Sequence, residues 1–278
     1  MVVGLLMVAG GFAAGLFGSL LGLGGGVLIV PLMTLGFGLE LREAVGVSLV
    51  SVIVTSSAAA GVYLERNVAN LRLGMTLELF TAVGALVGGL IAFLIEERVL
   101  AVLFAGMLGY LGLSMLRRRS SSADDPDDAI AASPSAPPEP RTARSAALER
   151  LSGDDYAVRN LGRGVVGSAG AGVISALLGV GGGIVKVPLM NLGMGVPLRV
   201  ATATSNLMIG VTAAASAVIY LLRGEIDPYV AGPTAIGVFL GATAGSRVAH
   251  RIRLPVLRAL FVVVLLYTAV QMLLRALG

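Results

Sequence analysis

Two glycine triplets are the residues best suited to do chemistry. The sequence GLGGGVLIVPLM covers residues 22–33, and GVGGGIVKVPLM covers residues 179–190. Consecutive glycines destabilise a helix interior by roughly 1 kcal/mol each relative to Ala. At the start of a helix, however, they leave backbone N–H groups open to an anion, which the helix dipole also attracts. The triplets Gly24, Gly25, Gly26 and Gly181, Gly182, Gly183 are therefore predicted to hold an anion between two facing helix N-termini.

Close helix packing is the alternative explanation for glycine in an apolar helix, because small residues let two backbones approach. Packing is the favoured role for the scattered glycines Gly84, Gly88, Gly89, Gly241 and Gly245. For the triplets we favour the anion site, because each recurs with a proline at the same distance. A nucleotide phosphate loop is not indicated, since no Lys-Ser/Thr pair follows the glycines.

Two charged residues lie within apolar segments. Lys186 is the only lysine of the chain and follows the second triplet by three residues, where the first copy has Ile29. A charge inside a membrane is by default a functional candidate, and snorkelling to the interface is the alternative. Glu78 lies about seven residues into its predicted span. It is a candidate for carrying a coupling proton, although we favour an interfacial carboxylate there.

Polar side chains also line one face of the helix that follows each triplet. In the second copy they recur at i, i+3, i+6 and i+7, a spacing that places them on one side of a helix. Such Ser and Thr side chains can instead bond to their own helix backbone. The substrate-binding candidates outside the triplets are Lys186, Thr34, Asn191, Ser48, Ser205, Asn206 and Arg199.

The composition is that of a membrane protein. Of the 278 residues, 56% are hydrophobic and 13% are charged, against roughly 25% charged in a soluble domain. Several apolar runs reach the roughly 20 residues that span a bilayer. The chain has no cysteine and a single histidine, which argues against metal sites and nucleophilic catalysis. We expect no enzyme activity, cofactor, metal or nucleic-acid partner, but a lipid bilayer and a small anion.

The chain is a duplication. Shifting it by 157 positions aligns the halves without a gap, so that Pro31 meets Pro188, Arg42 meets Arg199 and Tyr63 meets Tyr220. The predicted domains are a first membrane repeat (1–119), a disordered cytoplasmic linker (120–163) and a second membrane repeat (164–278). The linker is rich in Ser, Pro, Asp and Ala, a composition that cannot bury enough apolar surface to fold.

Each repeat is predicted to begin with a broken-helix hairpin and continue with three spans. The spans are 44–64, 73–95, 99–116, 200–222, 231–249 and 256–276. The two arms of the second hairpin, 164–178 and 184–195, would reach only about 22 and 18 Å, short of a ~30 Å hydrocarbon core. A hairpin that enters and leaves by one face, with its glycine tip near the midplane, fits these lengths.

Arginine placement favours inverted repeats. If each repeat crosses the membrane an odd number of times, ten arginines outside the linker lie on the linker side and four on the other. An even number of crossings gives seven and seven, against the cytoplasmic excess of basic residues that membrane proteins show. The predicted fold is therefore an all-α integral membrane protein with two inverted repeats.

The paired motifs resemble the TauE/SafE family of sulfite exporters. The resemblance lies in GLGGGVLIVP and GVGGGIVKVP, followed by REAVGVSL and RVATATSN, and covers both halves without the linker. It implies a transporter in the bacterial inner membrane for small anions such as sulfite, sulfoacetate or other sulfonates. The role of Lys186 is not carried over from the family pattern and depends on the argument from the residues alone. An anion-selective channel and a carboxylate permease that use the same site are the alternatives.

Overall fold

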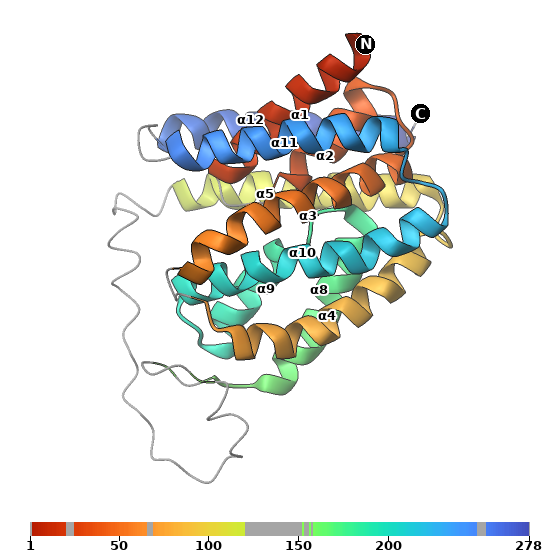
Figure 1. Cartoon of the computed structure of the whole chain (residues 1–278). Helices are drawn as coiled ribbons and strands as arrows, with labels where there is room; N and C mark the ends of the chain where they lie inside the picture. Colours follow the sequence, from red (N-terminus) through yellow and green to blue (C-terminus); the bar gives the residue numbers. More distant parts are fainter. Residues whose placement is uncertain are drawn as a thin grey trace.

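The computed structural model of the chain describes residues 2–20, 25–65, 69–119, 152, 156, 158–248 and 254–277. The regular elements in these ranges are helices (Figure 1). The first half contains α1 (Val2–Leu20), α2 (Gly26–Pro31), the π-helical turn η1 (Leu32–Gly36), α3 (Leu41–Glu65), α4 (Leu71–Ala92) and α5 (Glu97–Arg119). The second half contains α8 (Leu161–Leu178), α9 (Gly183–Pro188), the π-helical turn η2 (Leu189–Gly193), α10 (Leu198–Leu222), α11 (Pro228–Val248) and α12 (Leu254–Leu277).

The duplication predicted from the sequence is visible in these bounds. Each element from α2 to α5 starts 157 positions before its counterpart between α9 and α12, as for Gly26 and Gly183. In both halves a proline ends the short helix and a π-helical turn follows it. Proline has no backbone N–H and its ring crowds the preceding turn, so the regular hydrogen-bond ladder is disturbed at this point.

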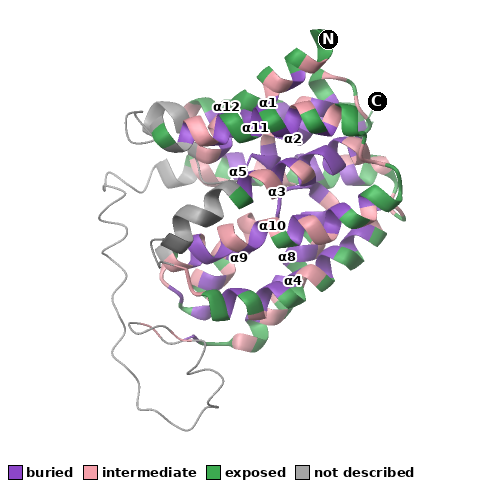
Figure 2. Cartoon of the chain, in the orientation of Figure 1, coloured by how far each residue is buried: buried purple, intermediate pink, exposed green. Residues whose placement is uncertain are grey.

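Six of the described helices, among them α1 and α8, are long and apolar enough to cross a membrane. Large apolar side chains on α4 are exposed at Leu79, Val83, Leu86 and Leu90, a helical spacing that forms one stripe. Figure 2 shows this contrast between the outward face of α4 and the buried centre of the bundle. The exposed stripe is the surface expected to face lipid.

The first arm of the second hairpin is longer than predicted. α8 begins at Leu161 rather than Gly164 and has 18 residues, or about 27 Å of helix. The residues just before it are bonded to both repeats. Tyr156 Oη accepts a 2.7 Å hydrogen bond from Asn70 Nδ2, and the Arg159 N–H donates to Met194 O at 3.0 Å. The predicted linker boundary at 163 is therefore too late, whereas residues 120–151 lie outside the described part.

Each hairpin packs against the opposite repeat. α1 lies along α11 and α8 lies along α4. A Cβ added at Gly84 would overlap the Ala169 carbonyl, and one at the counterpart Gly241 would overlap that of Phe12. The pairs Gly88 with Val173 and Gly245 with Leu16 repeat the pattern. The packing role predicted for these four glycines is confirmed, and the two halves interlock through equivalent contacts.

The counterpart helices α3 and α10 cross at the centre in opposite directions (Figure 1). Gly46, near the start of α3, lies against Glu225, which follows the end of α10. Further along α3, Ser56 Oγ donates to Asn206 O at 2.8 Å and accepts from the Gly210 N–H at 3.0 Å. This crossing carries the polar face of each helix to the two glycine tips.

Candidate functional site

The two glycine tips touch each other at the centre of the bundle. A Cβ added at Gly26, the first residue of α2, would lie 2.8 Å from the carbonyl oxygen of Gly179, which ends α8. The Ser48 hydroxyl of α3 lies between them, donating toward Gly179 O at 2.7 Å and Gly26 O at 3.1 Å. Ser48 therefore holds the two tips together, and its hydrogen is already engaged by carbonyls.

The glycines of the tips are required by backbone shape at some positions and by packing at others. Gly25, Gly181 and Gly182 have φ of 58°, 75° and 73°, in the region that side chains disfavour by roughly 1–2 kcal/mol. Packing also excludes a side chain, since a Cβ at Gly26 would lie 2.6 Å from Val52 Cγ2 and one at Gly183 would lie 2.5 Å from Ile209 Cδ1. The packing alternative thus contributes at the triplets too. Gly24 lies outside the described residues.

The second tip is bordered by hydroxyl groups with free hydrogen-bonding capacity. Ser205 Oγ and Ser175 Oγ are both buried, and neither has a hydrogen-bond partner among the described residues. A Cβ on Gly183 would lie 3.5 Å from Ser205 Oγ, and one on Gly182 would lie 3.7 Å from Ser175 Oγ. Leaving a buried polar group unpaired costs roughly 1–3 kcal/mol. The hydroxyls are thus available to a ligand beside the first amides of α9, which have no acceptor within the helix.

A buried ion pair lies next to this tip. Lys186 of α9 binds Glu78 of α4 through Nζ and Oε2, and the two side chains are 4% and 6% exposed. Thr212 of α10 completes the centre: its Oγ1 donates to Glu78 Oε1 at 2.6 Å and lies 3.1 Å from Lys186 Nζ. Lys186 does not snorkel to an interface. Glu78 is likewise turned into the protein, and its interfacial depth in the membrane stays a prediction.

Thr212 was missing from the candidates drawn from the sequence. It lies seven residues after Ser205, so both occupy the same face of α10. Continuing the polar face by two turns would have included it. The pairing with Glu78 would still have been hidden, since 134 positions separate the two residues.

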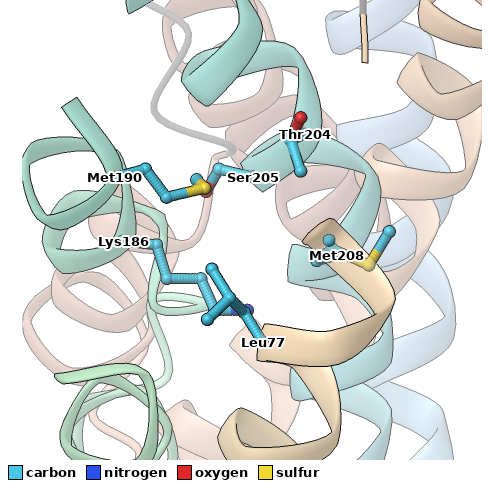
Figure 3. A pocket seen from close by; sticks show the side chains of 7 residues that line it. Leu77, Lys186, Met190, Thr204, Ser205 and Met208 are labelled. Carbon is cyan, nitrogen blue, oxygen red and sulfur yellow. The ribbon is translucent and has the colours of Figure 1, made fainter. Parts of the chain in front are cut away.

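A small cavity is lined by Lys186 of the ion pair and by Ser205, the hydroxyl next to the second tip. Its volume is about 10 Å³, close to the minimum that one water molecule needs. Figure 3 shows Lys186 and Ser205 at this cavity, with the side chains of Met190, Met208 and Leu77 around them. The cavity is too small for a sulfite or sulfonate ion, so this conformation is closed around the site.

The remaining candidates lie elsewhere or serve the backbone. Thr34 Oγ1 donates to Val30 O at 2.9 Å, and its counterpart Asn191 donates through Nδ2 to Val196 O at 3.0 Å. Both follow the proline of their arm, so the structure does not bring them to the tips. Asn206 lies one residue beyond Ser205, and its carbonyl accepts the Ser56 hydroxyl. The side chain of Arg199 is outside the described part.

Comparison with known proteins assigns the family. Residues 7–272 match the family described as "Sulfite exporter TauE/SafE". The chain belongs to the TauE/SafE family. This confirms the resemblance drawn from the glycine motifs, and with the six apolar helices it makes the chain a multi-pass membrane transporter rather than an enzyme.

Several TauE/SafE relatives match most of the chain. Probable membrane transporter protein YunE of Bacillus subtilis (strain 168) is 25% identical over 275 residues, 96% of each chain. Probable membrane transporter protein YdhB of the same strain is 24% identical over 241 residues, 85% of this chain and 86% of the relative. A probable membrane transporter protein of Xylella fastidiosa (strain 9a5c) is 25% identical over 242 residues, 87% and 81% of the two chains. No solved structure matches.

Proposed function

We propose that this TauE/SafE transporter carries a small sulfur-containing anion, such as sulfite, sulfoacetate or another sulfonate, by alternating access. The anion would be held near the bilayer midplane between the glycine tips. The main support is the second tip itself, where the unpartnered hydroxyls of Ser205 and Ser175 lie beside Gly182 and Gly183. Hydroxyls, free amides and one lysine together form a set of donors that suits an oxyanion.

Inverted repeats are part of this proposal. A two-fold axis in the membrane plane requires counterpart helices to run in opposite directions, as α3 and α10 do around the tips. The equivalent glycine contacts of α1 with α11 and of α8 with α4 support the same symmetry. Interrupted helices at the interface of inverted repeats are the usual location of a transporter's substrate site.

A carrier is favoured over a channel by the closed site. The cavity at Lys186 and Ser205 holds about 10 Å³, so an anion of several atoms can enter only after the surrounding helices move. A channel would need a path through these same residues that is continuous from one side to the other. Packing of Val52 and Ile209 against the glycines fills that position.

Counterflow in proteoliposomes tests the proposed function. Vesicles loaded with unlabelled sulfite, isethionate or sulfoacetate should take up the same labelled anion against its concentration, with saturation. A channel gives flux without counterflow, and a carboxylate permease responds to acetate or succinate but not to the sulfur anions. Either result overturns the proposal.

A further inference from the structure

We propose that Glu78, Lys186 and Thr212 form a coupling centre in which a proton on Glu78 releases Lys186 to pair with the transported anion. This inference depends on the proposed function, because it assigns the anion to the cavity beside the second tip. It adds to that function the coupling ion, which is one proton, and the group that changes partner, which is Lys186.

Lys186 is placed to serve both partners. Its Nζ binds the Glu78 carboxylate and the Thr212 hydroxyl, while its side chain also lines the cavity that Ser205 shares. Figure 3 shows the stem of the lysine side chain along this cavity, its nitrogen near Leu77 and Ser205 beside Met190 on the other side. An anion in this cavity would compete with the carboxylate of Glu78 for the ammonium group once the lysine side chain turns from Glu78 toward the cavity.

Charge balance makes the competition exclusive. A lone charge in a buried site costs several kcal/mol, so each charge is retained only with an opposite partner. The empty centre holds one cation and one carboxylate. An arriving monoanion adds a second negative charge, which is compensated when a proton from the water on the open side binds Glu78. Lys186 keeps its own proton throughout, and the centre stays neutral.

Other charges near the centre do not provide this compensation. On the helices packed around it, α4 and α8 also carry Arg72 and Arg163, and both are exposed. The side chain of Arg199 on α10 is outside the described part. Among the described side chains, Lys186 therefore has Glu78 as its only acidic partner.

Among the described residues the centre occurs once, formed by Glu78 of the first repeat with Lys186 and Thr212 of the second. The positions equivalent to Lys186, Glu78 and Thr212 in the duplication are Ile29, Ala235 and Thr55. Ile29 is fully buried and Ala235 is 9% exposed, so two of the equivalent positions in the duplication carry buried apolar residues. One such centre per chain predicts one proton per transport cycle, which balances one negative charge.

Proteoliposomes and the probe isethionate test the coupling, with sulfite as a second probe. Isethionate is a fully ionised sulfonate across the usable pH range, so any proton movement belongs to the protein. In the wild type, an acidic exterior should drive uptake up to about tenfold accumulation per pH unit, the limit for one proton per anion. An imposed membrane potential should leave this flux unchanged, because the net charge moved is zero.

Glu78→Gln keeps the shape of the side chain but fixes it in the uncharged state. We expect this variant to exchange isethionate in counterflow, to lose all accumulation driven by the pH gradient, and to become sensitive to membrane potential. Glu96→Gln removes an exposed carboxylate in the turn before α5 and should behave as the wild type.

The outcomes separate the two proposals. If the wild type transports neither isethionate nor sulfite, the proposed function is overturned. Net uptake that responds to membrane potential in the wild type, or a pH-driven accumulation that persists in Glu78→Gln, overturns the coupling centre alone. If Glu78→Gln does not insert, the two wild-type measurements still decide.

Discussion

Removing the lysine charge gives the most direct energetic test of the buried pair. Lys186→Met keeps a long apolar side chain but leaves Glu78 with Thr212, at 2.6 Å, as its remaining partner. The two side chains are only 4% and 6% exposed. The relevant scale is therefore the loss of about 3–5 kcal/mol of stability that follows when one member of a buried pair is removed. An exposed pair would lose about 0–1 kcal/mol.

Protonation limits this loss and gives it a pH dependence. A stranded carboxylate can take up a proton, and doing so costs an ordinary Glu about 1.4 kcal/mol for each pH unit above its solution pKa of about 4.3. The destabilisation of Lys186→Met should therefore not exceed about 3.7 kcal/mol at pH 7 and about 1.6 kcal/mol at pH 5.5. The variant should approach the wild type on acidification, because the carboxylate then accepts a proton at lower cost.

Unfolding in mixed micelles titrated with a denaturing detergent measures these free energies. The double variant Lys186→Met/Glu78→Gln removes both charges and should recover much of the stability that the single variant loses at pH 7. Arg72→Met, an exposed cation on α4, is the control and should change stability by about 0.5 kcal/mol or less. A single variant within 1 kcal/mol of the wild type at pH 7, on the order of an exposed pair, would refute the reasoning. So would a double variant less stable than the single one.

Three further predictions concern the tips, the topology and an extramembrane carboxylate. Gly182→Val, at φ 73°, should abolish isethionate binding in thermal-shift titrations. The control Gly109→Ala, whose added Cβ meets open space, should retain binding. Equal affinity in a folded Gly182→Val protein excludes the tip as the anion site. If the repeats are inverted, single cysteines at Leu94 and at His250 should be labelled from opposite sides of the membrane, with position 250 cytoplasmic. His250 lies outside the described residues. Labelling of both positions from one side contradicts the inversion. Burial raises the pKa of the Glu225 carboxyl, Arg42 lowers it and nearby carboxylates raise it again. A raised pKa means that the folded state binds the proton more tightly, so stability should fall as the pH rises above the ordinary pKa of a glutamate. Glu225→Gln should flatten that slope in the same micelle titration.

The repeat architecture could be predicted because its signals are local and occur twice. The triplet and the proline recur at one offset, and the starts of α2 and α9 keep that offset in the structure. The predicted spans also agree with the helices to within a few residues, as for 44–64 against α3. The beginning of α8 was missed because Gly162 and Arg163 read as linker. The residue types of Tyr156 and Arg159 do not reveal that Asn70 and Met194 bond to them in the folded protein.

The candidate site was only partly predictable because its charges come from distant segments. Glu78 and Lys186 are 108 positions apart, and the duplication aligns Glu78 with Ala235, so neither spacing nor repetition pairs them. Thr34 and Asn191 were attractive as polar residues in apolar arms, but a hydroxyl or amide that follows a helix-ending proline finds backbone carbonyls nearby. Type and position alone do not distinguish such local bonds from ligand contacts.

The two halves share a frame but differ in charge, and this difference bears on how transport would be driven. Equivalent contacts at Gly84 and Gly241 show that interlocking of the hairpins is the same in both repeats. If the halves exchange conformations to open the site to either side, this shared packing gives the two states similar backbone energies. A difference in energy between the two states then comes from the one centre without a counterpart, Lys186 with Glu78. Under the proposed mechanism, Lys186 pairs either with the Glu78 carboxylate or with the anion while Glu78 is protonated. Which of these two states is present determines when the repeats can change conformation.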